Sequence, residues 1–351
     1  MSYKCALVGC GRRAAGHAAA YQQLRRGSLA AVCDPHEDRV TAFAERFGVP
    51  ARYTDLEQML LREKPDVVHI VTRPNARRDL LIRLSDHGVG AAIVEKPIAS
   101  QREDYAELEA FLRTSRTRVC VNHQLHFHPR LVSLRRAVHD GSIGEVRFVD
   151  ASARMNLAYQ GTHLLQLIRG FLGQSRPVSV FGQVAGVTGL RGDRDHYSPD
   201  ECVAAIGYAN GVRALLTCGP SAPATTDGAV HLHKRVGVFG SLGIAHWTMW
   251  SWELTHADRC IVAGTHDYFE QDVQAQAALT DAVFDWLDDE RAVHPTSLEA
   301  SLIDFSVVLG IYVSALRSEP VSLPADPVPN LVDELRARLG SRLAAEPESS
   351  R

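Results

Sequence analysis

The sequence predicts an α/β protein in which a doubly wound parallel sheet is followed by an α+β domain with a mainly antiparallel sheet. Three observations support this fold class. Residues 4–34 read as a strand, a glycine-rich turn, a helix and a second strand. Apolar runs then alternate with helical segments as far as residue 124, as in a parallel sheet covered by helices on both faces. Beyond residue 124, strand-like runs follow one another with glycines between them.

The glycine-rich turn has the spacing G-x-G-x-x-A and follows the first apolar run directly. Gly9 permits a tight turn, Gly11 lets the backbone approach a pyrophosphate, and the small Ala14 lets the helix pack close to the strand. Phosphate would bind the unpaired N–H groups at the helix start. Asp34 ends the second strand, where a carboxylate can accept hydrogen bonds from a ribose. The pattern predicts a dinucleotide-binding Rossmann domain; the alternative is a glycine turn in another α/β domain.

The other elements of this first domain alternate regularly. We expect helices at 37–47 and 54–64, after residue 75 to about 87, and at 101–114, with strands at 66–71, 91–94 and 118–121. Ligands of such sheets bind beyond the carboxyl ends of the strands, so polar residues there define the expected site. They are Arg73, Pro74, Asn75, Glu95, Lys96, Asn122, His123 and Gln124.

The second domain is predicted to mix strands with a few helices. Helices are expected at about 129–139 and 161–172, and strands at 145–154, 177–185, 202–209, 212–218, 230–239 and 244–254. Asn210 and Gly211, between two of these strands, are a strong hairpin signal. Two long amphipathic helices, at about 272–288 and 297–316, precede a proline-rich segment at 320–329. We therefore place the domains at residues 1–123 and 124–330, and expect residues 340–351 to be frayed.

Composition narrows the function classes. The chain has 351 residues, 45% hydrophobic and 23% charged, with a net charge of −3, which is typical of a soluble two-domain protein. Its arginines are scattered, so no nucleic-acid partner is expected. The seven cysteines show no C-x-x-C spacing and are expected to be reduced core residues. No secretory signal is visible and no apolar stretch approaches the roughly 18 residues of a membrane span, so we expect a cytoplasmic protein without a membrane partner.

Several motifs in this order resemble the glucose-fructose oxidoreductase, inositol dehydrogenase and rhizopine-catabolism (Gfo/Idh/MocA) family. They are Gly9-x-Gly11, Asp34, Pro74-Asn75, Glu95-Lys96-Pro97 and Gly161-Thr162-His163. The resemblance covers residue 3 to about 325, and its most specific element is E-K-P after the fifth strand. It implies a nicotinamide-dependent oxidoreductase acting on sugars or cyclitols. It also implies an open-faced sheet in the second domain, which commonly mediates homodimers or homotetramers.

Lys96 is the main catalytic candidate. Alcohol oxidation moves a hydride to nicotinamide while a proton leaves the hydroxyl, so one group must exchange that proton near working pH. Lys96 resembles the family lysine that hydrogen-bonds the reacting oxygen, and burial together with the positive charge of oxidised nicotinamide would lower its pKa. Glu95 is expected to position Lys96 or the cofactor. The alternative for Lys96 is a solvated surface lysine.

His163 resembles the second catalytic group of the family and begins a helix. A histidine can shuttle a proton at physiological pH. The family pattern D-x-G-x-H-x-x-D is altered here, because Tyr159 and Gln166 replace the two acids. Tyr159 can hydrogen-bond a substrate hydroxyl but cannot stabilise an imidazolium as a carboxylate does. His163 is therefore either catalytic or substrate-binding, or a packed helix histidine.

The cofactor is expected to be NAD. The Asp34 carboxylate repels a 2′-phosphate, although Arg39, one helical turn on, leaves NADP possible. Arg12 or Arg13 could cover an adenine or a phosphate. The residues expected to bind the cofactor are Gly9, Gly11, Arg12, Arg13, Asp34, Arg73, Pro74, Asn75, Glu95, Lys96 and Gln124.

The segment 122–129 is rich in imidazoles and begins the crossover between the domains. His123 and His126 are therefore candidate substrate contacts, together with Lys96, Tyr159 and His163. No two histidines form H-x-x-x-H or pair with cysteines at ligand spacing, so no metal is expected.

Three functions remain open at this point. The leading one is an NAD-dependent dehydrogenase or ketoreductase for a sugar, aminosugar or cyclitol, and the polar loop 191–201 fits a polyol, although it could be a plain solvent loop. The second is a glycoside hydrolase that uses bound NAD for transient oxidation and elimination. The third is a non-catalytic sensor on the same fold, which the replaced acids allow and Lys96 opposes.

Overall fold

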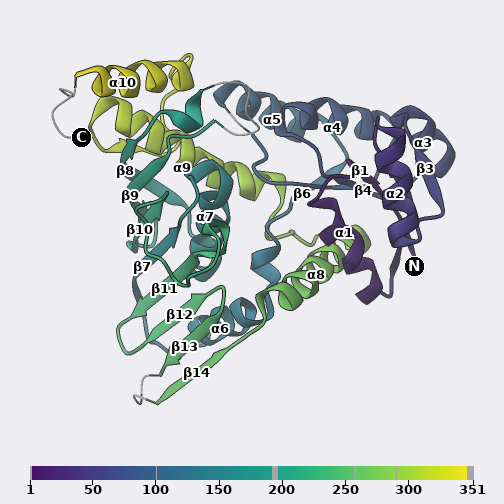
Figure 1. Cartoon of the computed structure of the whole chain (residues 1–351). Helices are drawn as coiled ribbons and strands as arrows, with labels where there is room; N and C mark the ends of the chain where they lie inside the picture. The colour runs from purple at the N-terminus through teal and green to yellow at the C-terminus, as the bar shows by residue number, and fades with distance from the viewer. Residues whose placement is uncertain are drawn as a thin grey trace. The chain divides into compact units, whose positions relative to one another are not determined.

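A computed structural model describes residues 2–99, 101–191, 197–256, 258, 260–289 and 291–345 (Figure 1). The chain forms two compact units. The first comprises Met1–Ile98, Ala106–Pro129 and Asp267–Leu302, and the second comprises Ala99–Tyr105, Arg130–His266 and Ile303–Arg351. Residues 267–302 thus group with the N-terminal unit, whereas the sequence reading assigned them to the second domain.

The first unit is built on a six-stranded sheet in the order β3-β2-β1-β4-β5-β6. The strands, all parallel, are β1 Tyr3–Val8, β2 Gly27–Cys33, β3 Ala51–Tyr53, β4 Val67–Ile70, β5 Ala91–Val94 and β6 Arg118–Val121. The strand order reverses between β1 and β4, and ligands of doubly wound sheets bind at that point. The prediction of a Rossmann sheet is confirmed.

The predicted helices of this unit lie within about two residues of their expected bounds, except that α8 begins at Tyr268, four residues before its expected start. They are α1 Ala14–Ala20, α2 Glu37–Phe47, α3 Leu56–Glu63, α4 Arg77–Asp86, most of α5 Arg102–Thr114 and α8 Tyr268–Asp288, with short η1 Tyr21–Gln23, η2 Pro74–Ala76 and η3 Gln124–Phe127. The Asp55 carboxylate accepts the Glu57 N–H at 2.7 Å and so caps α3. Gly48 ends α2 with a φ of 64°, a left-handed conformation that glycine adopts without strain.

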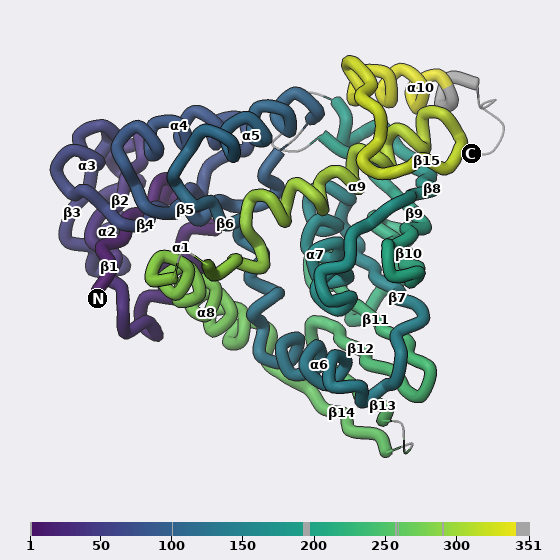
Figure 2. Tube along the Cα trace, turned by 180° about the vertical axis from the view of Figure 1, so that it is seen from behind, coloured from purple at the N-terminus to yellow at the C-terminus, as the bar shows by residue number. Residues whose placement is uncertain are grey.

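Helix α8 packs on the N-terminal sheet although it is distant in sequence. It runs alongside α1 (Figure 2). The ring of Phe284 on α8 stacks on Tyr3 of β1, with 4.6 Å between centroids. A Cβ at Gly27 would lie 2.4 Å from the same ring, so β2 needs glycine at this point. The helix therefore completes the core of the first unit.

The second unit contains a nine-stranded sheet in the order β14-β13-β12-β11-β7-β10-β9-β8-β15. Its strands are β7 Val146–Ala153, β8 Pro177–Ala185, β9 Glu201–Tyr208, β10 Arg213–Cys218, β11 Lys234–Gly240, β12 Ile244–Thr248, β13 Ser251–Thr255, β14 Ile261–Thr265 and β15 Val321–Ser322. In the described sheet β7 and β10 pair in parallel and the remaining pairs are antiparallel. The predicted mainly antiparallel sheet is confirmed.

Two features of this sheet differ from the prediction. The single strand expected at 244–254 is a hairpin, because Thr248 Oγ1 accepts the N–H groups of Trp250 at 3.1 Å and Ser251 at 3.0 Å and turns the chain. Strand β14 was not predicted. The turn at 248–251 carries no glycine or proline signal of the kind on which the prediction relied. Strand β14 has only five residues, and Gly264 lies within it rather than at a boundary.

The helices of the second unit are α6 Pro129–His139, α7 Thr162–Phe171, most of α9 Leu298–Arg317 and α10 Leu331–Ala345, with short η4 Leu157–Gly161, η5 Thr188–Leu190 and η6 Val230–Leu232. The first residues of α9, 298–302, group with the first unit. Every residue of α7 is buried. Helix α10 was not predicted. It includes residues 340–345 of the tail that was expected to fray, and residues 346–351 lie outside the described part of the chain.

Helix α9 corrects the statement that no apolar stretch approaches the length of a membrane span. Within the described part of the chain it is long and apolar enough to cross a membrane, with a mean hydropathy of 1.6 over 18 residues. However, 78% of that window is buried inside the protein, and a buried core helix passes the same test. Length and composition alone therefore do not argue for a membrane.

Candidate active site

The glycine turn leaves open space where the sequence predicts a pyrophosphate. Gly9 has a φ of 95°, and a Cβ there would lie 2.5 Å from the Val71 carbonyl oxygen, so this position requires glycine for folding. At Gly11 a Cβ would meet no protein atom within 4 Å. Glycine at position 11 is therefore not needed for internal packing, and the open backbone fits the close approach of a dinucleotide.

Asp34 connects the end of β2 to this turn. Its Oδ2 accepts the Cys10 N–H at 2.9 Å, its Oδ1 accepts the His36 N–H at 3.0 Å, and Arg39 Nη1 lies 3.3 Å from Oδ2. Burial would raise the pKa of Asp34, but these hydrogen bonds and the Arg39 charge outweigh it and lower the pKa. The carboxylate is thus ionised and holds the glycine turn, a task that sequence reasoning missed. Its contact with a ribose stays a prediction.

Glu95, at the carboxyl end of β5, is the centre of a buried polar network. Its Oε1 accepts Asn122 Nδ2 at 2.7 Å, Arg13 Nε at 2.9 Å and His17 Nε2 at 2.9 Å. Burial alone would raise the pKa of Glu95, but the Arg13 guanidinium and the His17 hydrogen bond hold it well below its usual value. Glu95 is therefore a fixed negative charge directly before Lys96.

Two further contacts, both involving histidine rings, extend the network, and the donor and the acceptor of each can be assigned. His17 Nδ1 lies 2.9 Å from His69 Nδ1, and His69 Nε2 lies 2.8 Å from the Tyr21 hydroxyl. Burial lowers the pKa of both histidines, so both are neutral. A carboxylate only accepts, so His17 donates from Nε2 to Glu95 and accepts at Nδ1 from His69. His69 then accepts from Tyr21, and the tautomers of both rings follow from the ionised state of Glu95.

Helix α8 completes the network on its other side. Asn122 and Gln276 exchange two hydrogen bonds of 3.0 Å each. Asp272 accepts Gln124 Nε2 at 2.9 Å and Arg13 Nη1 at 3.4 Å. The guanidinium of Arg13 is thus engaged by side chains of the protein, whereas the sequence suggested that it could cover an adenine or a phosphate.

Lys96 follows Glu95 and is half-buried. Burial lowers the pKa of Lys96; Glu95 opposes this effect, while the nearby Arg13 and Arg77 charges add to it, giving a pKa of about 8. The amine can therefore hold or release a proton close to neutral pH, as a general acid or base must.

The other first-unit residues predicted for the site gather at the same edge of the sheet. Arg12 is exposed beside Gly11, Arg73 and Asn75 are exposed on either side of Pro74 beyond β4, and His123, Gln124 and His126 are buried beyond β6. The residues that sequence reasoning missed are Asn122 as a Glu95 partner, His17, His69, Asp272 and Gln276. Polar residues on otherwise buried element faces were the available signal for them.

Tyr159 and His163 lie in the second unit, one turn apart. Tyr159 is part of η4, where its N–H is accepted by Asn156 Oδ1 at 2.9 Å, and His163 is buried in the first turn of α7. Gln166, at the position of the second missing acid, is buried on the same helix. The catalytic and substrate-binding roles of Tyr159 and His163 stay predictions.

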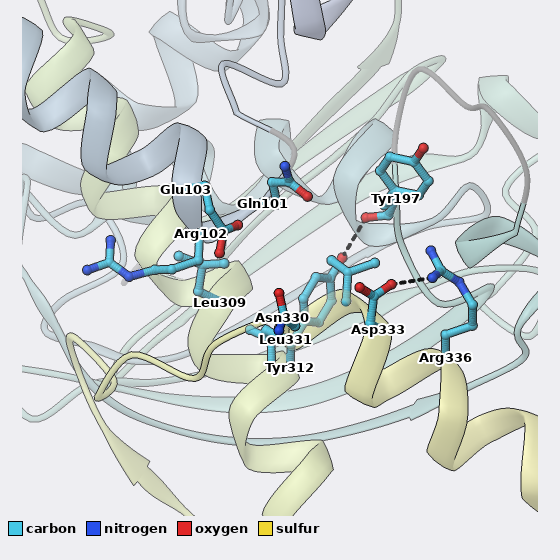
Figure 3. A pocket seen from close by; sticks show the side chains of 11 residues that line it. Gln101, Arg102, Glu103, Tyr197, Leu309, Tyr312, Asn330, Leu331, Asp333 and Arg336 are labelled. Carbon is cyan, nitrogen blue, oxygen red and sulfur yellow. Dashed lines mark hydrogen bonds and ion pairs between the residues drawn. The ribbon is translucent and has the colours of Figure 1, made fainter.

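The second unit also holds a cavity of about 430 Å³ near α10 (Figure 3). It is lined by Gln101, Arg102, Glu103, Tyr197, Leu309, Tyr312, Asn330, Leu331, Val332, Asp333 and Arg336. None of the predicted site residues lines it. Of the polar loop expected to bind a polyol, Tyr197 reaches this cavity, while residues 192–196 lie outside the described part of the chain. Among the described residues, no group of three or more His, Cys, Asp or Glu could hold a metal ion.

Comparison with protein families agrees with the fold and the glycine turn. Residues 3–123 match the model of an oxidoreductase family described as having an NAD-binding Rossmann fold. The expected dinucleotide domain and its NAD-type cofactor are therefore confirmed at the level of the family.

Among curated proteins, the chain is similar to dehydrogenases of sugars and cyclitols. A D-apiose dehydrogenase of Paraburkholderia graminis is 31% identical over 142 residues, or 40% of this chain, and this match spans only 38% of that enzyme's length. An inositol 2-dehydrogenase of Rhizobium meliloti is 25% identical over 284 residues, or 77% of this chain and 83% of that enzyme.

Among solved structures, an oxidoreductase from Agrobacterium radiobacter in complex with NAD⁺, L-tartaric acid and magnesium has a TM-score of 0.78. It is 19% identical, and the match covers 92% of this chain and 98% of that protein. At this identity the likeness establishes the shared two-domain fold and nothing finer.

Proposed function

We propose that the protein moves a hydride between NAD and a secondary alcohol or ketone. The premise is that residues 3–123 of this chain belong to the Gfo/Idh/MocA family of NAD-binding oxidoreductases. The substrate class is a sugar, aminosugar or cyclitol, as the names of the similar dehydrogenases suggest. The observation that carries the proposal is a half-buried lysine with a pKa of about 8 at the nucleotide-binding edge of the sheet.

When bound, NAD supplies the hydride acceptor for alcohol oxidation. The open backbone at Gly11 admits the pyrophosphate, and Asp34 holds the turn that presents it. The neutral amine of Lys96 takes the proton of the reacting hydroxyl, and its ammonium form returns a proton when a ketone is reduced. Glu95 remains ionised throughout and fixes the start of the turn that carries Lys96.

The presence of lysine rather than arginine at position 96 supports a role in which this side chain gains and loses a proton. Only four of the 38 basic residues in the chain are lysines, namely Lys4, Lys64, Lys96 and Lys234. This chain therefore uses arginine for most of its positive charges. An arginine cannot release its proton near neutral pH, whereas a buried lysine can.

A substrate screen tests the proposed function. Pentoses, hexoses, aminosugars and inositols are each offered with NAD and with NADP, and NADH or NADPH formation is followed by absorbance. We expect turnover with at least one polyol and a preference for NAD, because Asp34 is ionised. Release of the leaving group from an aryl glycoside without net NADH would instead indicate the hydrolase, and polyol or NAD binding without either reaction would indicate the sensor.

We also propose that the chain forms homodimers or homotetramers through the second-unit sheet. Phe148, Phe239 and Ile244 are cross-strand neighbours, so they share one face, and Phe181 and Val203 are exposed on strands of the same sheet. Exposed apolar clusters of this kind are typical of interfaces. Light scattering of the purified chain tests this proposal, and a mass of 38.5 kDa at micromolar concentration would contradict it.

A further inference from the structure

Arg77 is a buried cation that connects two loops at the nucleotide-binding edge. It is the first residue of α4 and is 3% exposed. Its Nη2 and Nε donate to the Thr72 carbonyl at 2.7 and 3.2 Å, and its Nη1 donates to the Pro97 carbonyl. Thr72 follows β4, and Pro97 is the residue after Lys96. One guanidinium thus joins the end of β4 to the turn that carries the proposed catalytic amine.

Burial of an arginine at this position is energetically unfavourable. Burying a charge carries a desolvation cost, and the first turn of a helix disfavours cations because the helix dipole is positive there. The adjacent Arg78 shows the ordinary alternative: it is exposed and forms ion pairs with Asp79 and Glu107. Other interactions must therefore offset the burial of Arg77, and its hydrogen bonds to the Thr72 and Pro97 carbonyls at the strand ends are among them.

The charges that act on Lys96 come from three elements. Glu95, at the end of β5, favours the ammonium form, while Arg13 from the glycine turn and Arg77 from α4 disfavour it. Arg13 forms ion pairs with Glu95 and Asp272. The Arg77 guanidinium donates to the carbonyls of Thr72 and Pro97, and the second of these hydrogen bonds reaches the residue next to Lys96.

We propose that Arg77 is a positioning residue for Lys96, which holds the 95–97 turn against the end of β4 and sets a positive charge beside the amine. The consequence for turnover rests on the proposed function. The consequence for the proton affinity of Lys96 does not, and it can be measured without a substrate.

Trace acetylation of the full chain with acetic anhydride at pH 6–10 measures that affinity, because only neutral amines react. With four lysines in the chain, mass spectrometry follows Lys96 separately, and Lys4 and Lys64 serve as internal references. In the unmodified protein we expect the Lys96 midpoint near the pKa of about 8. In Arg77→Gln the midpoint is expected to rise by about half a unit or more, because a nearby like charge is removed.

Matched variants separate this effect from a general disturbance. Arg77→Lys keeps the charge and should restore most of the midpoint, whereas Arg78→Gln should leave it unchanged. If Arg77→Gln does not fold, Arg77→His replaces it, since its imidazole is neutral above about pH 7 and the midpoint should again rise. A folded Arg77→Gln or Arg77→His protein with an unmoved Lys96 midpoint overturns the inference.

Activity then distinguishes the two proposals. If a polyol is oxidised, the acid limb of kcat/KM should move to higher pH in Arg77→Gln together with the acetylation midpoint. A moved midpoint without turnover of any polyol supports the role of Arg77 and contradicts the proposed function. Turnover of a polyol together with an unmoved Lys96 midpoint supports the proposed function and contradicts the role of Arg77.

Discussion

Replacing Lys96 with alanine is expected to lower kcat/KM for the polyol found in the screen by about 10²- to 10⁴-fold, the usual contribution of a general acid or base. The Kd for NAD should change little, because the glycine turn and Asp34 are untouched. The methyl group of alanine can neither accept the hydroxyl proton nor return it to a ketone. Steady-state rates with NADH absorbance measure the first quantity, and titration calorimetry with NAD measures the second.

Two companion variants decide what Lys96 contributes. Lys96→Arg retains a positive charge that does not deprotonate near neutral pH, so it should remain as impaired as the alanine variant if proton transfer is the role. Lys4→Ala removes an exposed lysine whose ion pair with Glu63 lies at the surface, and it should behave as the unmodified protein. Full activity of Lys96→Ala would refute the mechanism, and full activity of Lys96→Arg would leave only an electrostatic role.

The first half of the fold was predictable because its signals are local. The glycine turn, the Asp55 cap and the alternation of apolar runs each lie within a few residues of the element that they specify. Helix α8 was recognised as a helix but assigned to the second domain. Its packing depends on contacts such as that between Tyr3 and Phe284, which are 281 residues apart, and no local pattern reports such a contact.

The site divides in the same way. Glu95 and Lys96 could be found from the sequence, since they follow a buried strand and their position in the sheet decides where they lie. His17, which bonds Glu95, and Gln276, which bonds Asn122, could not be found in this way. Both hydrogen bonds join elements that are far apart in the sequence, so they can be recognised only once the fold is known. The sequence identified Asp34 as a ribose-binding candidate, and its hydrogen bond with the Cys10 N–H adds a second role, which is to hold the glycine turn.

The two glycines of the turn should respond to alanine in different ways, and Gly9→Ala is expected to cause the larger loss of stability. Alanine at a φ of 95° adopts a conformation that costs about 1–2 kcal/mol, and its Cβ would lie 2.5 Å from the Val71 carbonyl oxygen. With overpacking of about 1–3 kcal/mol, we expect the free energy of unfolding to fall by about 2–5 kcal/mol. Urea denaturation measures this, and an unchanged transition midpoint would contradict the geometry of the turn.

Gly11→Ala is the matched variant to Gly9→Ala, and it should affect NAD binding without affecting stability. Its Cβ meets no protein atom within 4 Å, so the free energy of unfolding should stay within about 0.5 kcal/mol of the original or rise slightly. The same methyl group would occupy the space proposed for the pyrophosphate, so the Kd for NAD should rise by about 10- to 100-fold, equivalent to about 1.4–2.8 kcal/mol. Because stability and binding separate at this one position, unchanged NAD affinity in a folded Gly11→Ala protein would mean that the dinucleotide does not cross the glycine turn. The proton transfer proposed for Lys96 would then have no cofactor beside it.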